Sequence, residues 1–359
     1  MLVEIVVSPN DAGQRAERFL RRWFPLLATG RLQSLFRRKE IKIAKRPVDQ
    51  AYMLKAGDML QVFGIRDEEA QRPETHKPTA SASPASPPPP IVFEDHDLLV
   101  VNKPSGMAAH PGSGILQGTS LIERVRAYLA TAAKAQKKTK VPKIRPRHAT
   151  EEPEDASLEE LLFGGSNEGL TPGWGMELFS PSLVHRLDKE TSGVLLVAKT
   201  GSALRELTEA LRAGKIRKRY LALVVGHPDP AAGTIDAALA RQDSAAGAKS
   251  YIADEDEEGK RSVTRYKTIR TVGEYALLQV VIETGRMHQI RAHLAHIGHP
   301  IVGDTRYSGE RPAEVRERMK KLGLKRLFLH AEELSWKDGA TKRVFQAPLP
   351  HELGKVVGL

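Results

Sequence analysis

The stretch from residue 181 to 199, PSLVHRLDKETSGVLLVAK, constrains the fold of this chain most. Its second half, Val194–Ala198, is a short apolar run rich in β-branched residues, which predicts a buried strand. Its first half is polar and places Asp188 between Arg186 and Lys189, just before that strand. The segment therefore predicts an ionised carboxylate held at the end of a core strand.

Such a carboxylate has two interpretations. Neighbouring positive charge lowers the pKa of an aspartate and burial raises it, so the group is suited to chemistry in a cleft. Ion pairs at strand ends also stabilise folds without any catalytic role. The Arg-x-Asp pattern alone leaves both interpretations open.

Length and charge limit the possible classes of protein. A chain of 359 residues is long enough for two domains with a sizeable core. The formal net charge of +11 favours a polyanionic partner, with RNA or DNA first and an anionic membrane second. The absence of cysteine excludes disulfides, thiolate metal sites and a Cys nucleophile, and suits a reducing compartment. We expect neither a signal peptide nor a membrane span, because no suitable apolar run is present.

The first 66 residues predict a small basic module. Apolar spacing predicts one helix from about Gly13 to Trp23, with Asp11 as its N-cap, and a second helix at Gly30–Lys39. Strands are expected at Glu40–Ile43 and Met59–Val62. Residues 1–65 contain twelve Lys and Arg against six Asp and Glu. This charge indicates either a solvated helix face or a surface that contacts phosphates.

The order of these elements resembles the αL-type RNA-binding domain, whose closing pattern KAGD-x-L-x-V is found at residues 55–62. The resemblance implies RNA contacts from the basic residues of the second helix and the following strand, namely Arg31, Arg37, Arg38, Lys39 and Lys42.

Two further segments do not look like core. Residues 67–90 are rich in Pro, Ser and Ala and predict an extended linker. Residues 131–180 contain a basic block, an acidic block and a Gly-rich block, which predict a flexible insertion. The domain of residues 91–359 therefore has an insertion at 131–180.

Polar motifs recur in the rest of this domain. The segment NKPSGMAAHPG begins at residue 102, after an expected strand pair within 91–101. Tyr220 begins an expected strand behind four cations, in KIRKRYLALVV. It is either a packed strand-edge residue or a ring on which an exposed base stacks. GRMHQIR leads into an expected helix at His288–Ile297. Its several histidines invite a metal interpretation, but no carboxylate stands at ligand spacing, so we expect no metal.

HRLDKETSGVLL resembles the HRLD-x-x-TSG signature of the RluA-type pseudouridine synthases. The other motifs of that family are present as NKPSG…HPG, KRYLA, GRMHQIR and RLFLHA, so the resemblance covers residues 91–349. The insertion at 131–180 departs from the family pattern and puts substrate access in question.

The resemblance implies an α+β catalytic domain with a mixed, mostly antiparallel sheet flanked by helices. It implies that Asp188 is the catalytic aspartate, that Tyr220 stacks on the target uracil and that Arg291 pairs with Asp188. Arg186 would enter the gap that the flipped nucleotide leaves, and His185 would join it in contacting RNA. The reaction cleaves the N1–C1′ bond of uridine, turns the uracil and rejoins it at C5, which requires no cofactor.

We therefore expect a cytoplasmic, monomeric enzyme that modifies large-subunit ribosomal RNA at uridines in loops or single strands. A tRNA or dual-specificity synthase is the alternative within the class. A non-catalytic RNA-binding assembly factor is the alternative of another class. An aspartate-nucleophile hydrolase of small esters is less consistent with the basic N-terminus.

Overall fold

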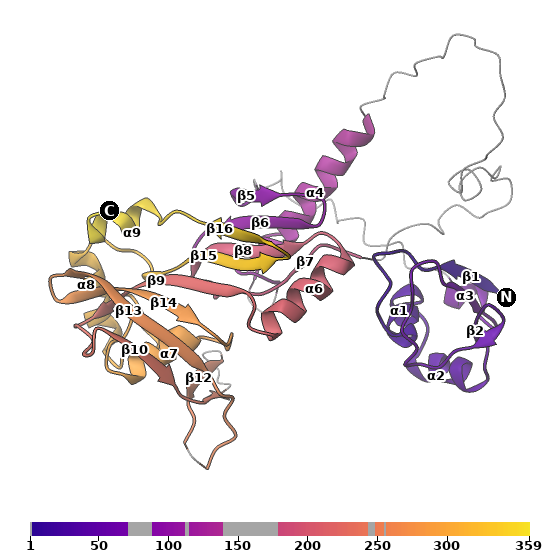
Figure 1. Ribbon diagram of the computed structural model, residues 1–359, viewed down its shortest axis with the longest axis horizontal. Coiled ribbons are helices and arrows are strands. Elements are labelled where there is room, and N and C mark those ends of the chain that lie inside the picture. The colour runs from indigo at the N-terminus through magenta and orange to yellow at the C-terminus, as the bar shows by residue number, and fades with distance from the viewer. Residues whose placement is uncertain (1, 71–87, 112–114, 139–178, 243–247, 255) are drawn as a thin grey trace, which may run out of the picture. The chain divides into compact units, whose positions relative to one another are not determined.

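The computed structural model describes residues 2–70, 88–111, 115–138, 179–242, 248–254 and 256–359. The chain forms two compact units, one built on residues 2–70 and the other on residues 88–128 and 180–359 (Figure 1).

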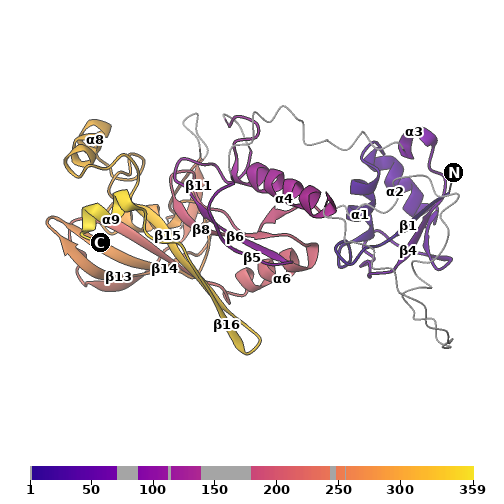
Figure 2. The same ribbon diagram turned by 90° about the horizontal axis from the view of Figure 1, so that it is seen from above.

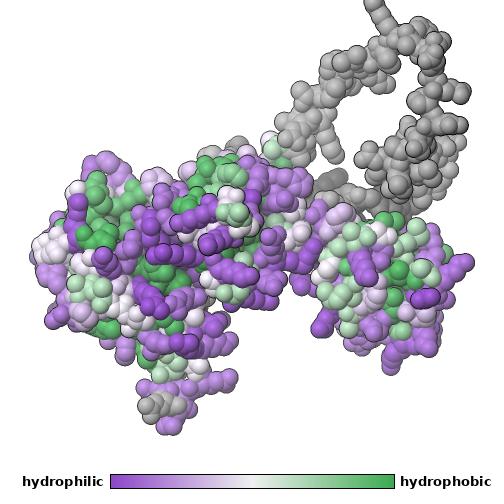
Figure 3. Space-filling view, viewed as in Figure 1, coloured by the Kyte–Doolittle hydropathy of each residue, from purple (hydrophilic) through white to green (hydrophobic). Residues whose placement is uncertain are grey.

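The N-terminal unit packs two helices against a four-stranded sheet with the strand order β1-β4-β2-β3. Its elements are β1 (Val3–Val6), α1 (Ala16–Trp23), α2 (Thr29–Arg37), β2 (Ile41–Ile43), β3 (Arg46–Pro47), β4 (Met59–Val62) and α3 (Asp67–Ala70). The predicted apolar faces are confirmed, since Phe19 and Leu20 of α1 and Leu35 of α2 are fully buried. Figure 3 shows hydrophilic surface over the part of this unit where α2 lies in Figure 1.

The predicted start of the first helix was wrong. The helix begins at Ala16 and its N-cap residue is Arg15, which makes no side-chain capping bond. Asp11 instead accepts a hydrogen bond from the Ser8 hydroxyl at 2.9 Å. Residues 9–14 form turns and Arg15 is extended, because this segment pairs with a distant one: Arg15 bridges Met53, and the Ala16 N–H donates to the Tyr52 carbonyl at 2.8 Å. The short helix α3 also lies within the stretch assigned to the linker, and residues 71–87 lie outside the described part of the chain.

The second unit is organised around a ten-stranded sheet. Its strands follow the order β10-β13-β14-β9-β15-β8-β6-β5, with β16 beside β15 and β7 beside β8. The strands are β5 (Ile91–Glu94), β6 (Leu98–Lys103), β7 (Ser182–Leu183), β8 (Ser192–Ala198), β9 (Arg217–Val225), β10 (Ala232–Asp236), β13 (Val263–Val272), β14 (Tyr275–Ile282), β15 (Leu329–Asp338) and β16 (Thr341–Gln346). The β8–β15 pairing is parallel and the others are antiparallel. This arrangement confirms the expected α+β fold with a mixed, mostly antiparallel sheet.

Helices flank this sheet. They are α4 (Leu121–Lys138), α6 (Gly201–Arg212), α7 (Gln289–His296), α8 (Pro312–Lys321) and α9 (His351–Val357). Figures 1 and 2 show α4 and α6 flanking the part of the sheet formed by β5, β6 and β8. The small hairpin β11 (Leu239–Gln242) and β12 (Lys249–Ile252) packs beside α7. In the described part of the chain, no helix is long and apolar enough to cross a membrane.

The first part of the predicted insertion at 131–180 is helical, since α4 continues to Lys138. Residues 139–178, which make up most of it, lie outside the described residues.

The strand β8 places the HRLD segment. All seven of its residues are buried, as the apolar run predicted. Gly193 adopts a φ of 122°, and a Cβ there would collide with the Ala331 backbone of β15. Only glycine allows this close strand contact. The turn before β8 is closed by the Thr191 N–H, which donates to the Asp188 carbonyl at 3.1 Å. Asp188 is thereby fixed at the end of a core strand.

Candidate active site

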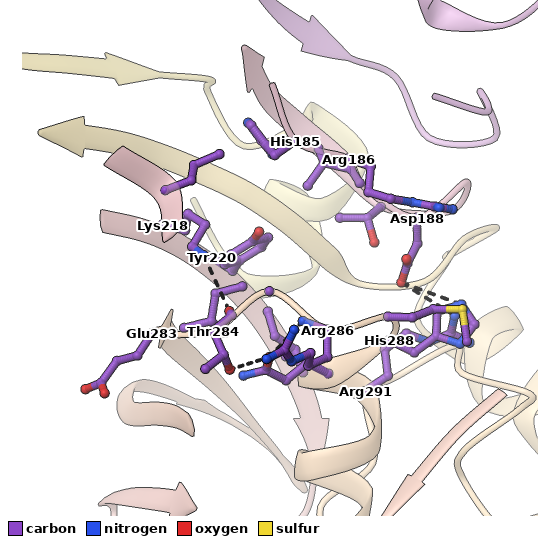
Figure 4. Close-up of a pocket in the computed structure, with 18 of the residues that line it drawn as sticks. His185, Arg186, Asp188, Lys218, Tyr220, Glu283, Thr284, Arg286, His288 and Arg291 are labelled. Atoms are coloured by element: carbon purple, nitrogen blue, oxygen red, sulfur yellow. Dashed lines mark hydrogen bonds and ion pairs between the residues drawn. The ribbon is translucent and has the colours of Figure 1, made fainter. Parts of the chain in front are cut away.

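A cavity of about 660 Å³ opens where three sequence motifs meet. One wall is the HRLD segment, the second is the start of β9, and the third is the segment from Ile282 to Arg291 that leads into α7 (Figure 4). Asp188, Tyr220 and Arg291, predicted from motifs far apart in the sequence, all line this cavity.

Tyr220 lies in the middle of the sheet. It pairs with Val280 of β14 on one side and Ala331 of β15 on the other, and the residue is 6% exposed. Burial, and then the negative charge of Asp188, raise the pKa of Tyr220 well above its ordinary value. The ring is therefore a rigid, neutral wall of the cavity.

Asp188 faces two nitrogen groups through a single oxygen. Its Oδ2 lies 3.8 Å from Nε2 of His288 and 3.9 Å from Nη1 of Arg291. The carboxylate is 21% exposed, so it is open to a substrate and sheltered from bulk water. Figure 4 shows it pointing toward His288 and Arg291, whereas Arg186 lies on the other side of it.

The closest partner of Arg291 is a residue that sequence reasoning missed. Its Nε and Nη2 donate to Asp304 Oδ2 and Oδ1 at 2.7 and 2.8 Å, which is a two-point pair. Asp304 is 1% exposed. Burial alone would lower the pKa of Arg291, but the hydrogen bonds to Asp304 and the charges of both aspartates raise it. The expected pairing of Arg291 with Asp188 is thus present only as the longer contact.

His288 stands directly before α7, which begins one residue later than predicted. Its φ of 53° is left-handed, a conformation unusual for a residue other than glycine. Its Nδ1 lies 2.9 Å from the Tyr307 hydroxyl. Burial, followed by the charges of Arg291 and Arg306, lowers its pKa, while Asp188 acts in the opposite direction. Sequence reasoning considered this histidine only as a metal ligand and did not single out Tyr307.

Two other histidines of this region make structural bonds. His293 Nε2 lies 3.2 Å from the Ala237 carbonyl, and His299 Nδ1 lies 2.9 Å from the Val225 carbonyl. Within the described ranges, no group of three or more His, Asp or Glu side chains is placed to hold a metal ion.

His185, expected to contact RNA, is occupied within the fold. Its Nε2 accepts a hydrogen bond from the Leu196 N–H of β8 at 3.2 Å. Burial, and then the charge of Lys218, lower its pKa to about 4, so the ring is neutral. Lys218 is itself buried and donates to the Thr284 carbonyl at 3.4 Å. Arg186 is exposed and lines the same cavity.

The NKPSG loop holds the HRLD segment in place. Lys103 is fully buried, and its Nζ donates to the carbonyls of Pro104, Met107 and Lys189 at 3.0, 2.8 and 3.1 Å. The Ser105 hydroxyl donates to the Glu190 carbonyl at 2.7 Å. These bonds fix the two residues that follow Asp188.

The basic residues of the N-terminal unit fall into two groups. Arg31 donates to the Gly64 carbonyl at 2.7 Å, and the Lys42 ammonium lies 5.0 Å from the centre of the Phe63 ring. Both therefore contribute to the fold of the unit. The other three, Arg37, Arg38 and Lys39, are exposed at the end of α2.

Comparison with known proteins identifies the class. Residues 175–296 match the family of RNA pseudouridylate synthases. The chain is 34% identical over 350 residues to ribosomal large subunit pseudouridine synthase C of Salmonella typhimurium, covering 96% of this chain and 92% of that one. The corresponding Escherichia coli K12 protein is also 34% identical, over 354 residues, with 98% and 93% covered. The structure of human RNA pseudouridylate synthase domain containing 4 shares the fold, with a TM-score of 0.50 and 24% identity over 75% of this chain and 91% of that chain.

The fold and these relatives define an RNA pseudouridine synthase. Within that class, the chain belongs to the RluA-type family, as its motifs predicted.

Proposed function

We propose that this enzyme converts specific uridines of large-subunit ribosomal RNA to pseudouridine, with Asp188 as its catalytic group. The observation that carries the proposal is the convergence of three motifs on one carboxylate in a cavity large enough for a flipped nucleotide. The choice of RNA rests on the relatives named for the large ribosomal subunit, which match this chain over nearly its whole length.

The chemistry asks little of the protein beyond one carboxylate. The N1–C1′ bond breaks, the uracil turns, a C5–C1′ bond forms, and the proton lost from C5 is balanced by one gained at N1. No electrons are exchanged with a partner, so the reaction needs no redox cofactor. Asp188 acts as nucleophile or base, and Oδ1 is the oxygen that meets the substrate, because Oδ2 faces His288 and Arg291.

The remaining residues make the base accessible. A uridine inside a stack must be extruded, at a cost of a few kcal/mol. Arg186 at the cavity rim fills the gap in the RNA, and the Tyr220 ring stacks against the extruded uracil. Arg291 supplies a positive charge beside the Asp188 carboxylate when the RNA excludes water from the cavity.

The substrate context follows from the same steps. Uridines in loops or single strands are the easiest to extrude, so we assign the target to such regions. The exposed cations at the end of α2 provide sequence-independent contacts to phosphates. We further propose that the enzyme acts as a monomer and in the cytoplasm, since the residues assigned to the reaction all belong to one cavity of a single chain and the relatives act on ribosomal RNA.

The test is pseudouridine mapping by carbodiimide-dependent primer-extension stops. Ribosomal and transfer RNA are compared from cells with the gene, without it, and complemented with Asp188→Asn. We expect stops in large-subunit RNA that are absent from cells without the gene. Complementation with the wild-type protein should restore them, and complementation with Asp188→Asn should not. If stops are lost from tRNA alone, the substrate is tRNA and the assignment to large-subunit ribosomal RNA is wrong. Unchanged stops in both RNAs, with the wild-type protein expressed, contradict the function and favour the assembly-factor alternative.

A further inference from the structure

We propose that His288 is a positioning residue for Asp188, and that Tyr307 fixes it in the tautomer that points an N–H at the carboxylate. The inference rests on the proposed role of Asp188. It assigns a part in the reaction to His288 and Tyr307, which lie beside Asp188 and Arg291.

A chain of hydrogen bonds runs from strand β12 through Tyr307 to His288, and its first donor is known. The Ser250 backbone N–H lies 2.9 Å from the Tyr307 oxygen and can only donate to it. The hydroxyl keeps its proton, since burial raises the pKa of Tyr307 to about 12. That proton is then available to His288 Nδ1, which lies 2.9 Å away. A ring that accepts at Nδ1 carries its own hydrogen on Nε2.

The Nε2–H of this tautomer faces Asp188. The nitrogen lies 3.8 Å from Oδ2, the oxygen that Arg291 also approaches. This gap is longer than a hydrogen bond, and catalytic contacts are often long before substrate binds and shorten in the complex. His288 therefore acts as a neutral donor toward Oδ2 of Asp188, and Arg291 acts as a charged donor toward the same oxygen. Oδ1 of Asp188 is left to meet the substrate.

The ring of Tyr307 is held on several sides, so the chain of donors is rigid. The Arg291 guanidinium lies 5.0 Å from its centre and the Lys249 ammonium 4.9 Å from it. The His288 ring meets it edge-on, with centres 5.7 Å apart and planes at 85°. The Tyr307 N–H also donates to Asp304 Oδ1 at 3.1 Å. The same aspartate that positions Arg291 thus positions Tyr307.

The charges around His288 favour its neutral form. Arg291 and Arg306 oppose its protonation, as does burial, while Asp188 and Asp304 favour it. A neutral ring has one N–H, and the Tyr307 contact decides where that hydrogen sits. The unusual backbone of His288, at φ 53°, is the conformation that brings the ring between Tyr307 and Asp188.

The first measurement is spectroscopic and independent of turnover. In full-length protein labelled with ¹⁵N-histidine, long-range ¹H–¹⁵N correlation reports which ring nitrogen of His288 carries hydrogen. We expect the Nε2–H form in the wild type and a mixture of tautomers in Tyr307→Phe. An Nδ1–H form in the wild type overturns the proposal.

The second measurement is kinetic, on an RNA fragment that contains the mapped uridine. Tyr307→Phe removes one hydroxyl and should lower kcat about 3- to 10-fold with KM unchanged within twofold, as loss of one buried hydrogen bond implies. His288→Gln, which keeps an N–H near the Nε2 position, should retain more kcat than His288→Leu. The matched control is Tyr128→Phe, which removes a hydroxyl bonded to Glu94 away from the cavity.

Asp188→Asn separates two kinds of failure. If that variant turns over, the proposed role of Asp188 is wrong and the positioning role falls with it. If it is inactive while Tyr307→Phe and both His288 variants keep the wild-type kcat, only the positioning role is wrong.

Discussion

Arg291 is bound more closely to Asp304 than to Asp188. Two of its nitrogens lie 2.7 and 2.8 Å from the Asp304 carboxylate, while a third stays 3.9 Å from Asp188. Because Asp304 is buried, it neutralises most of the cation and fixes its orientation. Asp188 consequently faces a positioned guanidinium without being locked into an ion pair with it. That arrangement leaves the carboxylate available to react.

Asp304→Asn should therefore damage both stability and activity. Removing one partner of a buried pair leaves the other charge uncompensated, and costs about 3–5 kcal/mol in free energy of unfolding. Arg291 would be free to turn toward Asp188, so we also expect kcat to fall. The matched control is Asp338→Asn, which breaks an exposed pair with Arg343 and should cost about 1 kcal/mol or less. Equal losses in chemical denaturation of the two variants would contradict the assignment.

Asp188→Asn should damage activity but hardly change stability. The side chain is partly exposed and its two ionic contacts are long, so the free energy of unfolding should change little. Turnover of the RNA fragment should fall by at least about 10²–10⁴-fold, the usual contribution of a positioned acid or base. RNA binding, measured by filter retention, should stay within a few fold of the wild type. Turnover close to that of wild type would remove Asp188 from the reaction.

Tyr220→Leu tests the stacking surface. Leucine fills much of the same space in the sheet but has no ring face, and stacking of a base on an aromatic ring is worth about 1–3 kcal/mol. We expect kcat/KM to fall about 5- to 150-fold. Tyr266→Leu is the control, because Tyr266 is a buried tyrosine of the same sheet outside the cavity. If both variants lose activity in proportion to stability alone, the ring has no direct contact with the substrate.

Local patterns in the sequence predicted what local forces determine. The apolar run of β8 and the buried stripe of α1 follow from the spacing of apolar residues, and both are confirmed. The family motifs also placed Asp188, Tyr220 and Arg291 in one site before their contacts were known.

The parts that were missed depend on contacts between distant residues. Lys103 bonds a carbonyl 86 residues away, and Ser250 bonds the hydroxyl of Tyr307 57 residues away. The start of α1 was misplaced because residues before it pair with the segment around Tyr52. No periodicity encodes such pairings, and they exist only once the sheet has formed.

The exposed cations at the end of α2 should make RNA binding depend on salt concentration. Replacing Arg37, Arg38 and Lys39 together with Gln should weaken RNA binding and reduce the slope of log K against log salt by about 2–3, since each lost phosphate contact contributes about 0.7–0.9. The matched control replaces the exposed cations Arg316, Lys320 and Lys321 of α8 with Gln. Binding measured from low to physiological salt distinguishes the two. An unaltered slope in the first variant would show that α2 does not contact RNA.

The buried Lys103 should make the free energy of unfolding depend on pH. Burial, and then the charge of Arg326, lower its pKa from 10.5 to about 7 in the folded enzyme. Below pH 7 both folded and unfolded chains hold this proton. Between pH 7 and about 10.4 the unfolded chain holds the proton and the folded chain releases it. The unfolded state then binds more protons, so the contribution of Lys103 to stability rises with pH, by up to about 1.4 kcal/mol per unit.

Lys103→Met isolates this contribution. The variant removes the shared donor of the Pro104, Met107 and Lys189 carbonyls, of which that of Lys189 keeps the Gly106 N–H at 2.9 Å, so it should be less stable at every pH. The difference in free energy of unfolding between wild type and variant should widen from pH 7 to 9. Lys337→Met, at an exposed position of β15, should show no such widening. A difference that is flat or narrows with pH would mean that Lys103 stays charged, held as an ammonium by its three carbonyl acceptors.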